Sequence, residues 1–208
     1  MLLFLMMIGK NKKMKLNNIF VLLTSVILFV SCGTDGCYTP KPKGYMRIIF
    51  PEKNYVEYDT TALPFAFERS VSASVDLKKD ERRLKWVDIR YPDYNGIVFL
   101  SYIPIRNLND LAGEVDTSYQ LLSKHFDYSS GVEERKFVNE DAKVYATVYC
   151  LQGQNVASTY QFWATDSVSH FLRGSLYIDC VPNNDSLAPV LDYLQMDIEH
   201  LIETLRWR

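Results

Sequence analysis

The stretch of sequence that decides the fold is residues 185–205, which read DSLAPVLDYLQMDIEHLIETL. Its apolar residues recur every three or four positions, the spacing that places side chains on one face of an α-helix. These residues are Val190, Leu191, Leu194, Ile198, Leu201, Ile202 and Leu205. Asp185 or Ser186 can cap the helix, and Pro189 then falls in its first turn. A helix with one apolar face needs a covering surface, so we expect it to lie on a β-sheet.

Strand patterns fill the sequence directly before this helix. Strands are predicted over residues 136–151, 156–165 and 171–181, and polar turns separate them at 152–155 and 166–169. Consecutive strands joined by short turns run antiparallel. This part of the chain therefore predicts an antiparallel meander.

A hairpin is predicted farther upstream. Apolar and polar residues alternate over 84–91, and a second strand covers 97–103. Between them, Asn95-Gly96 supplies the positive φ that a tight hairpin turn needs. Three other segments have weaker patterns: residues 45–50 and 65–68 read as short strands, and residues 71–83 read as a loop.

A second helix follows the hairpin. From residue 107 the apolar spacing becomes helical, and Asn107 or Asn109 can cap a helix that ends near His125. Strands, a helix, a meander and a final helix do not alternate in the βαβα order of a parallel sheet. The fold class is therefore α/β in the broad sense (α+β), an antiparallel sheet covered by two main helices. This order is similar to the PsbP-like sandwich, an analogy that carries no function.

The beginning of the chain has the pattern of a bacterial lipoprotein export signal. An apolar run over 19–30 follows Lys15 and ends at Ser31, directly before Cys32. The run is too short to span a bilayer, which takes about 20 apolar residues. We predict cleavage before Cys32 and lipid on that cysteine, whereas a plain secretory signal is the alternative.

These features divide the chain into three parts. Residues 1–31 are predicted to be the signal peptide, with Met14 as the true start. Residues 32–44 comprise the lipidated cysteine and a proline-rich tether, and 45–208 form a single periplasmic α/β domain anchored in the cell envelope. Only Asp35 is acidic just after Cys32, and this favours an orientation toward the periplasm.

Charge and cysteine content limit the function classes. Four of the 23 basic residues and none of the 25 acidic ones precede Cys32, so the remaining chain has a formal net charge of −6. An acidic chain does not suit a nucleic-acid partner, which binds a basic face. Beyond Cys32 the cysteines are Cys37, Cys150 and Cys180, an odd number. A predicted strand separates Cys150 from Cys180, beyond disulfide reach, so we expect buried free thiols.

The residues that could carry chemistry do not form a catalytic constellation. His125, His170 and His200 fall on separate elements, and no phosphate-binding glycine loop is present. Asp197 and Glu203 lie three residues either side of His200, a pattern better explained by a solvated helix face than by a metal site. The sequence therefore assigns no catalytic, cofactor or metal residue and predicts a protein that is not an enzyme.

Four stretches resemble a known family. They are residues 38–53, with Tyr38-Thr-Pro-Lys-Pro-Lys-Gly-Tyr45, Arg47 and Phe50-Pro-Glu-Lys53; His170–Tyr177; Pro182–Pro189; and Asp197–Trp207. With the lipoprotein signal they resemble the gliding motility lipoprotein GldD family of Bacteroidota. The resemblance implies a cell-envelope lipoprotein that supports gliding and the type IX secretion machinery alongside other gliding and secretion lipoproteins. It implies no enzyme activity.

Two functional hypotheses remain open. The first is a non-catalytic interaction or assembly factor held to the membrane by the lipid on Cys32. The second is a small-molecule or lipid-binding lipoprotein with a pocket between sheet and helix. The tether by itself can be a simple spacer. The alternative is that Tyr38, Tyr45 and Arg47 contribute to partner binding, because aromatic and arginine side chains are enriched at binding hot spots. Arg173, set among apolar strand residues, needs a carboxylate or a partner protein if it is buried.

Overall fold

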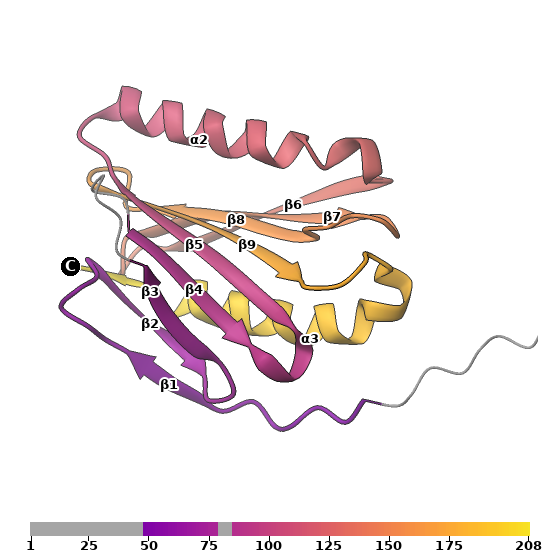
Figure 1. Ribbon diagram of the computed structural model, residues 1–208. Helices are drawn as coiled ribbons and strands as arrows, with labels where there is room; N and C mark the ends of the chain where they lie inside the picture. Colours follow the sequence, from indigo (N-terminus) through magenta and orange to yellow (C-terminus); the bar gives the residue numbers. More distant parts are fainter. Residues whose placement is uncertain (1–47, 79–84) are drawn as a thin grey trace, which may run out of the picture. The chain divides into compact units, whose positions relative to one another are not determined.

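The computed structural model describes residues 48–78 and 85–208, and over these it confirms the predicted α+β class (Figure 1). The strands are β1 (Tyr55–Tyr58), β2 (Phe65–Ser70), β3 (Ser74–Lys78), β4 (Lys85–Tyr91), β5 (Gly96–Pro104), β6 (Gly131–Asn139), β7 (Val144–Gln152), β8 (Tyr160–Thr165), β9 (His170–Ile178) and β10 (Arg206–Trp207). The helices are α2 (Leu108–Ser123) and α3 (Asn184–Glu203), with short 3₁₀ turns at Pro92–Tyr94 and Phe126–Tyr128.

Two antiparallel sheets organise these elements. The larger has seven strands in the order β3-β4-β5-β9-β8-β7-β6, and the smaller has three in the order β1-β2-β10. Every pairing in both sheets is antiparallel. The predicted three-strand meander is replaced by four strands, β6 through β9, and the predicted hairpin corresponds to β4 and β5.

The two helices lie on opposite faces of the large sheet (Figure 1). One face packs against α3 and β2 in the main hydrophobic core, where Phe65, Phe162 and Leu194 are fully buried. The other face lies under α2, where Leu122 packs against a smaller apolar cluster. Neither helix combines the length and apolar character needed to span a membrane, and residues 48–78 and 85–208 contain no other candidate.

The final helix confirms the main prediction from the sequence. Its central apolar residues are buried, with Ile198 at 1% and Leu201 at 3% exposure. The helix begins at Asn184, earlier than expected, and Pro189 therefore lies inside it rather than in its first turn. The backbone N–H and side-chain amide of Asn184 are bound by the β7–β8 connection, and this tertiary contact moves the start of the helix.

The other predicted helix forms where expected. Asn107 is its N-cap, and its side chain accepts a hydrogen bond from the Asp110 N–H at 2.9 Å. Its apolar stripe is only partly covered, because Leu108 and Tyr119 are exposed and Leu122 is buried. The helical period of α2 was therefore correct, but the period did not predict how little of the helix is covered.

The predicted strand over 136–151 is wrong, because this segment belongs to a hairpin of two strands. The turn between β6 and β7 places Lys143 in the left-handed region with a φ of 53°. The Asn139 side chain stabilises this turn by accepting a hydrogen bond from the Ala142 N–H at 3.0 Å. Asn139 and the residues after it were a turn signal within an otherwise continuous strand pattern.

The reading of 71–83 as a loop is also wrong, because part of it forms β3. This strand pairs with β4 and brings Lys78 to 2.6 Å from Asp88, which also pairs with Arg90 at 2.9 Å. Asp88 is buried although the alternation placed it on a polar face. The predicted hairpin turn is confirmed, with Asn95 at a φ of 49°.

Two further expectations need correction. Residues 48–50, the described part of the strand expected over 45–50, form no strand, because Phe50 packs on α3 instead. Cys150 and Cys180 are both free, as expected, but neither is fully buried, because Cys150 is partly exposed and Cys180 is exposed. Cys37 lies outside the described residues.

Gly174 provides a direct test of packing in the sheet. The ring of Phe162 covers this glycine, so an added Cβ would collide with ring carbons. We expect Gly174→Ala to destabilise the protein by about 1–3 kcal/mol in urea unfolding, the usual cost of overpacking. Gly113→Ala is the matched control, because apart from its chain neighbours and the nearby backbone of α2 no atom of the described residues lies within 4 Å of the new methyl group. Equal stability of the Gly174→Ala variant and the parent would contradict this packing.

Candidate functional site

The chain immediately after the predicted tether is fastened to α3. The Phe50 ring stacks on the Tyr193 ring with centroids 4.6 Å apart. Lys53 Nζ lies 2.7 Å from Asp197 Oδ1 and donates to the Tyr193 carbonyl at 2.6 Å. The same ammonium group lies 3.2 Å from the centre of the Tyr193 ring. We call Phe50, Lys53, Tyr193 and Asp197 the clamp.

The clamp is held in a largely buried setting. Asp197 is 3% exposed, and its Oδ1 also accepts a hydrogen bond from the Tyr55 hydroxyl at 3.0 Å. Burial lowers the pKa of Lys53 below its ordinary value, although the attraction of Asp197 opposes this shift. Burial, with the Asp197 carboxylate, raises the pKa of Tyr55. A buried ion pair with these extra bonds constrains the position of both segments.

The end of α3 is fastened in a similar way. His200 Nε2 lies 2.7 Å from Glu68 Oε2, and the His200 ring stacks on Tyr55. The Trp207 ring stacks on His170, and its Nε1–H donates to the Lys143 carbonyl at 3.0 Å. The expected solvated face around His200 is therefore wrong, since tertiary contacts occupy Asp197 and His200. The described residues contain no cluster of three metal-ligating side chains.

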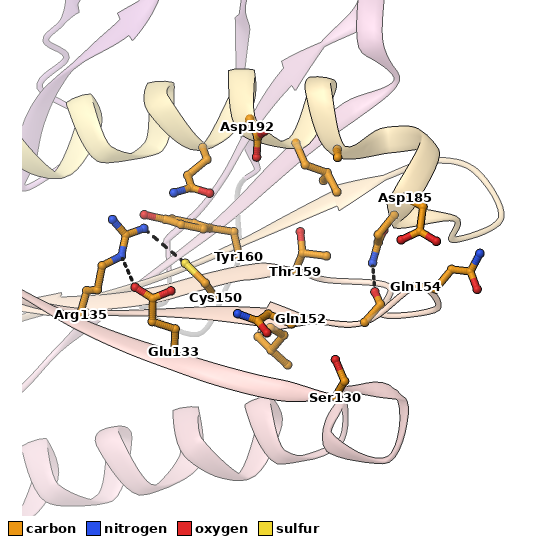
Figure 2. Close-up of a pocket in the computed structure, with 16 residues that line it drawn as sticks. Ser130, Glu133, Arg135, Cys150, Gln152, Gln154, Thr159, Tyr160, Asp185 and Asp192 are labelled. Carbon is orange, nitrogen blue, oxygen red and sulfur yellow. Dashed lines mark hydrogen bonds and ion pairs between the residues drawn. The ribbon is translucent and has the colours of Figure 1, made fainter. Parts of the chain in front are cut away.

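A groove of about 730 Å³ lies between α3 and the strands β6 and β7 (Figure 2). One wall comes from α3: Asn184, Asp185, Ala188, Leu191, Asp192 and Gln195. The opposite wall includes Glu133 and Arg135 of β6, Cys150 of β7 and Tyr160 of β8. The groove therefore has the size of a ligand site, but its lining mixes polar and apolar surface, whereas ligand pockets are usually mainly apolar.

Glu199 organises one end of this groove. Its Oε1 accepts hydrogen bonds from Arg135 Nη2 at 2.9 Å, Tyr160 Oη at 3.0 Å and Gln195 Nε2 at 3.1 Å. Arg135 Nη2 also donates to Cys150 Sγ at 3.3 Å. These hydrogen bonds join Arg135, Cys150, Tyr160, Gln195 and Glu199 into a connected polar network, in which Arg135 Nε lacks a hydrogen-bond partner among the described residues.

The thiol in this network is not set up as a nucleophile. Burial raises the pKa of Cys150, against the opposing effect of Arg135. A raised pKa keeps the thiol protonated near neutral pH, and the thiolate is the reactive form. Asp185 and Asp192 add carboxylates toward the other end of the groove. The lining can therefore bind polar or cationic groups through hydrogen bonds and charge.

Among the lipidation and partner-binding residues named from the sequence, only Arg173 lies within the residues that the structure describes. Cys32, Tyr38, Tyr45 and Arg47 lie outside the described residues, as do the signal peptide and tether. Arg173 lies on β9 and is half-buried. In the described part of the chain its side-chain partner is the Gln161 amide oxygen, 3.4 Å from Nη2, rather than a carboxylate. Burial lowers the pKa of this guanidinium group.

Sequence reasoning missed both the clamp and the groove. Asp197 follows Leu194 by three positions and precedes Leu201 by four, so it falls within the apolar stripe. A carboxylate in that position signals a buried partner, but nothing local identifies Lys53 as that partner. Asp185, Asp192 and Glu199 are spaced by seven residues and share one helix face, which was the available signal for the groove.

Comparisons with known proteins agree with the resemblance found in the sequence. The family model described as gliding motility lipoprotein GldD matches residues 35–207. No curated protein sequence matches the chain. Among solved structures, the chain is similar to the solution structure of cyanobacterial PsbP (CyanoP) from Synechocystis sp. PCC 6803. The two are 12% identical over 80% of this chain and 99% of that one, with a TM-score of 0.48.

Proposed function

This chain belongs to the gliding motility lipoprotein GldD family, and on that premise we propose that it is a non-catalytic assembly factor of the cell envelope. The family itself implies a role in gliding motility and attachment to a membrane of the envelope. The finer proposal is that the protein supports the type IX secretion machinery together with other gliding and secretion lipoproteins. It does so from the periplasmic side of its membrane.

Anchoring is proposed through the lipid on Cys32. An apolar run ending at Ser31 supports this assignment, because it is too short to cross a bilayer and directly precedes the cysteine. In this arrangement 1–31 is removed, 32–44 is the tether and 45–208 is one periplasmic domain. The net negative charge of the chain after cleavage does not favour electrostatic adhesion to anionic lipid.

The clamp is the observation that carries the assembly role. Residues 50–53 and 197–207, which supplied much of the family resemblance, meet in the structure and bind each other. Their polar groups are used to fasten the chain after the tether to α3. Residues that carry the family resemblance therefore hold two segments of the chain together. This use favours a positioning role over a catalytic one.

Partner binding is proposed for the tether and strand segment of residues 38–53 and for Arg173 on β9. Tyr38, Tyr45 and Arg47 are of the residue types that dominate binding hot spots, and prolines reduce the entropy lost on docking. Arg173 is proposed as a further contact, because its charged group is half-buried beside an amide.

A second candidate function is the binding of a small polar molecule in the groove. The volume of about 730 Å³ favours it, whereas the carboxylates and amides of the lining do not suit a lipid chain. Native mass spectrometry of the protein purified from its own envelope tests this idea. A retained small molecule that is lost in an Arg135→Ala variant would support ligand binding over assembly.

Cys32→Ala tests the main proposal. We expect the variant to remain uncleaved or to become soluble, and to lose support of gliding and secretion. A folded variant with Tyr38–Lys43 replaced by Gly and Ser separates anchoring from partner binding, because it keeps the lipid. Full activity of a soluble Cys32→Ala protein would contradict the anchored role, and full activity of the Gly/Ser variant would reduce the tether to a spacer.

A further inference from the structure

Strand β6 leaves one edge of the seven-stranded sheet open. It pairs with β7 on one side, and no other strand of the described residues pairs with it. The strand is nine residues long and exposed at most positions. Alternate residues of such an edge direct their N–H and C=O groups away from the sheet, where another strand can bind them.

Hollows flank this edge on both faces of the sheet. Glu134, Lys136 and Val138 line a hollow of about 300 Å³ on one face. Glu133 and Arg135 point to the opposite face and line the groove beside α3. A strand added along β6 therefore finds room for its side chains on both faces, the arrangement used when a peptide extends a sheet.

The side chains of β6 are complementary to those of the same strand turned by a two-fold rotation. One face carries, at alternate positions, Val132, Glu134, Lys136 and Val138. If two copies pair antiparallel about Arg135, Val132 lies opposite Val138 and Glu134 lies opposite Lys136. Both valines are exposed in the single chain, at 42% and 63%. Charged side chains on an edge strand ordinarily prevent pairing with another strand. Here Glu134 and Lys136 would instead attract each other across the two strands.

We propose that β6 binds β6 of a second copy of this chain, joining two large sheets across a two-fold axis. A second copy is the partner that fits this edge, because β6 itself contains both residues of each cross-strand pair: Val132 with Val138, and Glu134 with Lys136. Such an interface uses the same patch on both partners, as two-fold dimers do. This inference goes beyond the assembly role, since it concerns self-association and does not depend on any other protein.

Arg135, which falls on the axis, is compatible with this pairing. Its Nη2 lies 2.9 Å from Glu199 Oε1, and its Nε lies 3.6 Å from Glu133 Oε1. Each Arg135 guanidinium group therefore lies beside the carboxylates of Glu199 and Glu133 of its own copy. These negative charges reduce the repulsion between the two Arg135 side chains at the axis. Within one chain, the Lys136–Glu134 pair is exposed and loose at 3.9 Å, so both groups can exchange to the second copy.

Cysteine crosslinking in native membranes tests the register. The full lipoprotein carrying Val132→Cys and Val138→Cys should form a disulfide-linked dimer with a mild copper oxidant, because opposite strand residues lie within disulfide reach. Either single variant is the matched control, since the two copies of residue 132 are about 20 Å apart. The parent, which retains the native cysteines, sets the background. Equal crosslinking of single and double variants would overturn the proposal.

Charge reversal tests the chemistry in the same cysteine background. Glu134→Lys or Lys136→Glu places like charges opposite each other at both symmetric positions, so we expect about tenfold weaker dimerisation of the detergent-solubilised lipoprotein. The double reversal restores opposite charges and should return dimerisation to within about threefold of the parent. Lys124→Glu, outside β6, should have no effect. The proposal would be overturned if the parent protein is monomeric or if the double reversal does not restore dimerisation. Crosslinks that form only to other proteins would also overturn it.

Discussion

Lys53→Ala should destabilise the protein by about 3–5 kcal/mol, because it leaves the Asp197 carboxylate buried without its cation. Asp197 is 3% exposed, and the Lys53 side chain is 17% exposed, so water cannot readily replace the ammonium group. The Tyr55 hydroxyl remains as a neutral partner for Oδ1. Equilibrium urea unfolding followed by tryptophan fluorescence measures the loss.

A paired replacement separates the ion pair from the packing around it. Burial lowers the pKa of Lys53, and the attraction of Asp197 raises it by less. The loss of water around the ammonium group is therefore the larger of the two effects. Lys53→Met combined with Asp197→Leu should therefore recover part of the stability lost in Lys53→Ala, since a buried pair can often be exchanged for apolar residues. Recovery is incomplete because the Tyr55 hydroxyl loses its acceptor.

The matched control for the clamp is Arg206→Ala, which breaks the exposed pair between Arg206 and Glu57. Exposed ion pairs contribute about 0–1 kcal/mol, so this variant should resemble the parent. A Lys53→Ala variant as stable as Arg206→Ala would show that the clamp does not hold the chain to α3.

Leu201→Ala should cost about 2–5 kcal/mol in the same measurement. Leu201 is 3% exposed and belongs to the main core, in which α3 packs on the large sheet. The replacement removes buried methyl groups and leaves a cavity that the surrounding side chains only partly fill. Ile198→Val, one methylene smaller at a 1% exposed position, should cost about 0.5–1.5 kcal/mol.

Met196→Ala is the control on the same helix, because Met196 is 54% exposed. A surface change of this kind ordinarily alters stability by less than about 0.5 kcal/mol. If Leu201→Ala and Met196→Ala were equally mild, the apolar stripe of α3 would not be the surface that packs on the sheet.

The sequence by itself determined the features that depend on neighbouring residues. The apolar spacing of 190–205 predicted α3 and its buried face, and one of the two candidate caps, Asn107, begins α2. Asn95-Gly96 predicted the hairpin turn, and the order of elements predicted an antiparallel sheet with two helices. Periodicity and capping act over a few residues, so a single sequence is sufficient to reveal them.

Only the tertiary structure decided which polar groups are buried and what they bind. Lys53 and Asp197 are 144 residues apart in the chain, and neither has a local pattern that names the other. The same holds for Asp88, whose burial depends on β3, and for the groove between α3 and β6. Local spacing assigns a side chain to a face of its own element. Whether another element covers that face, and with which charge, depends on contacts made only after the chain has folded.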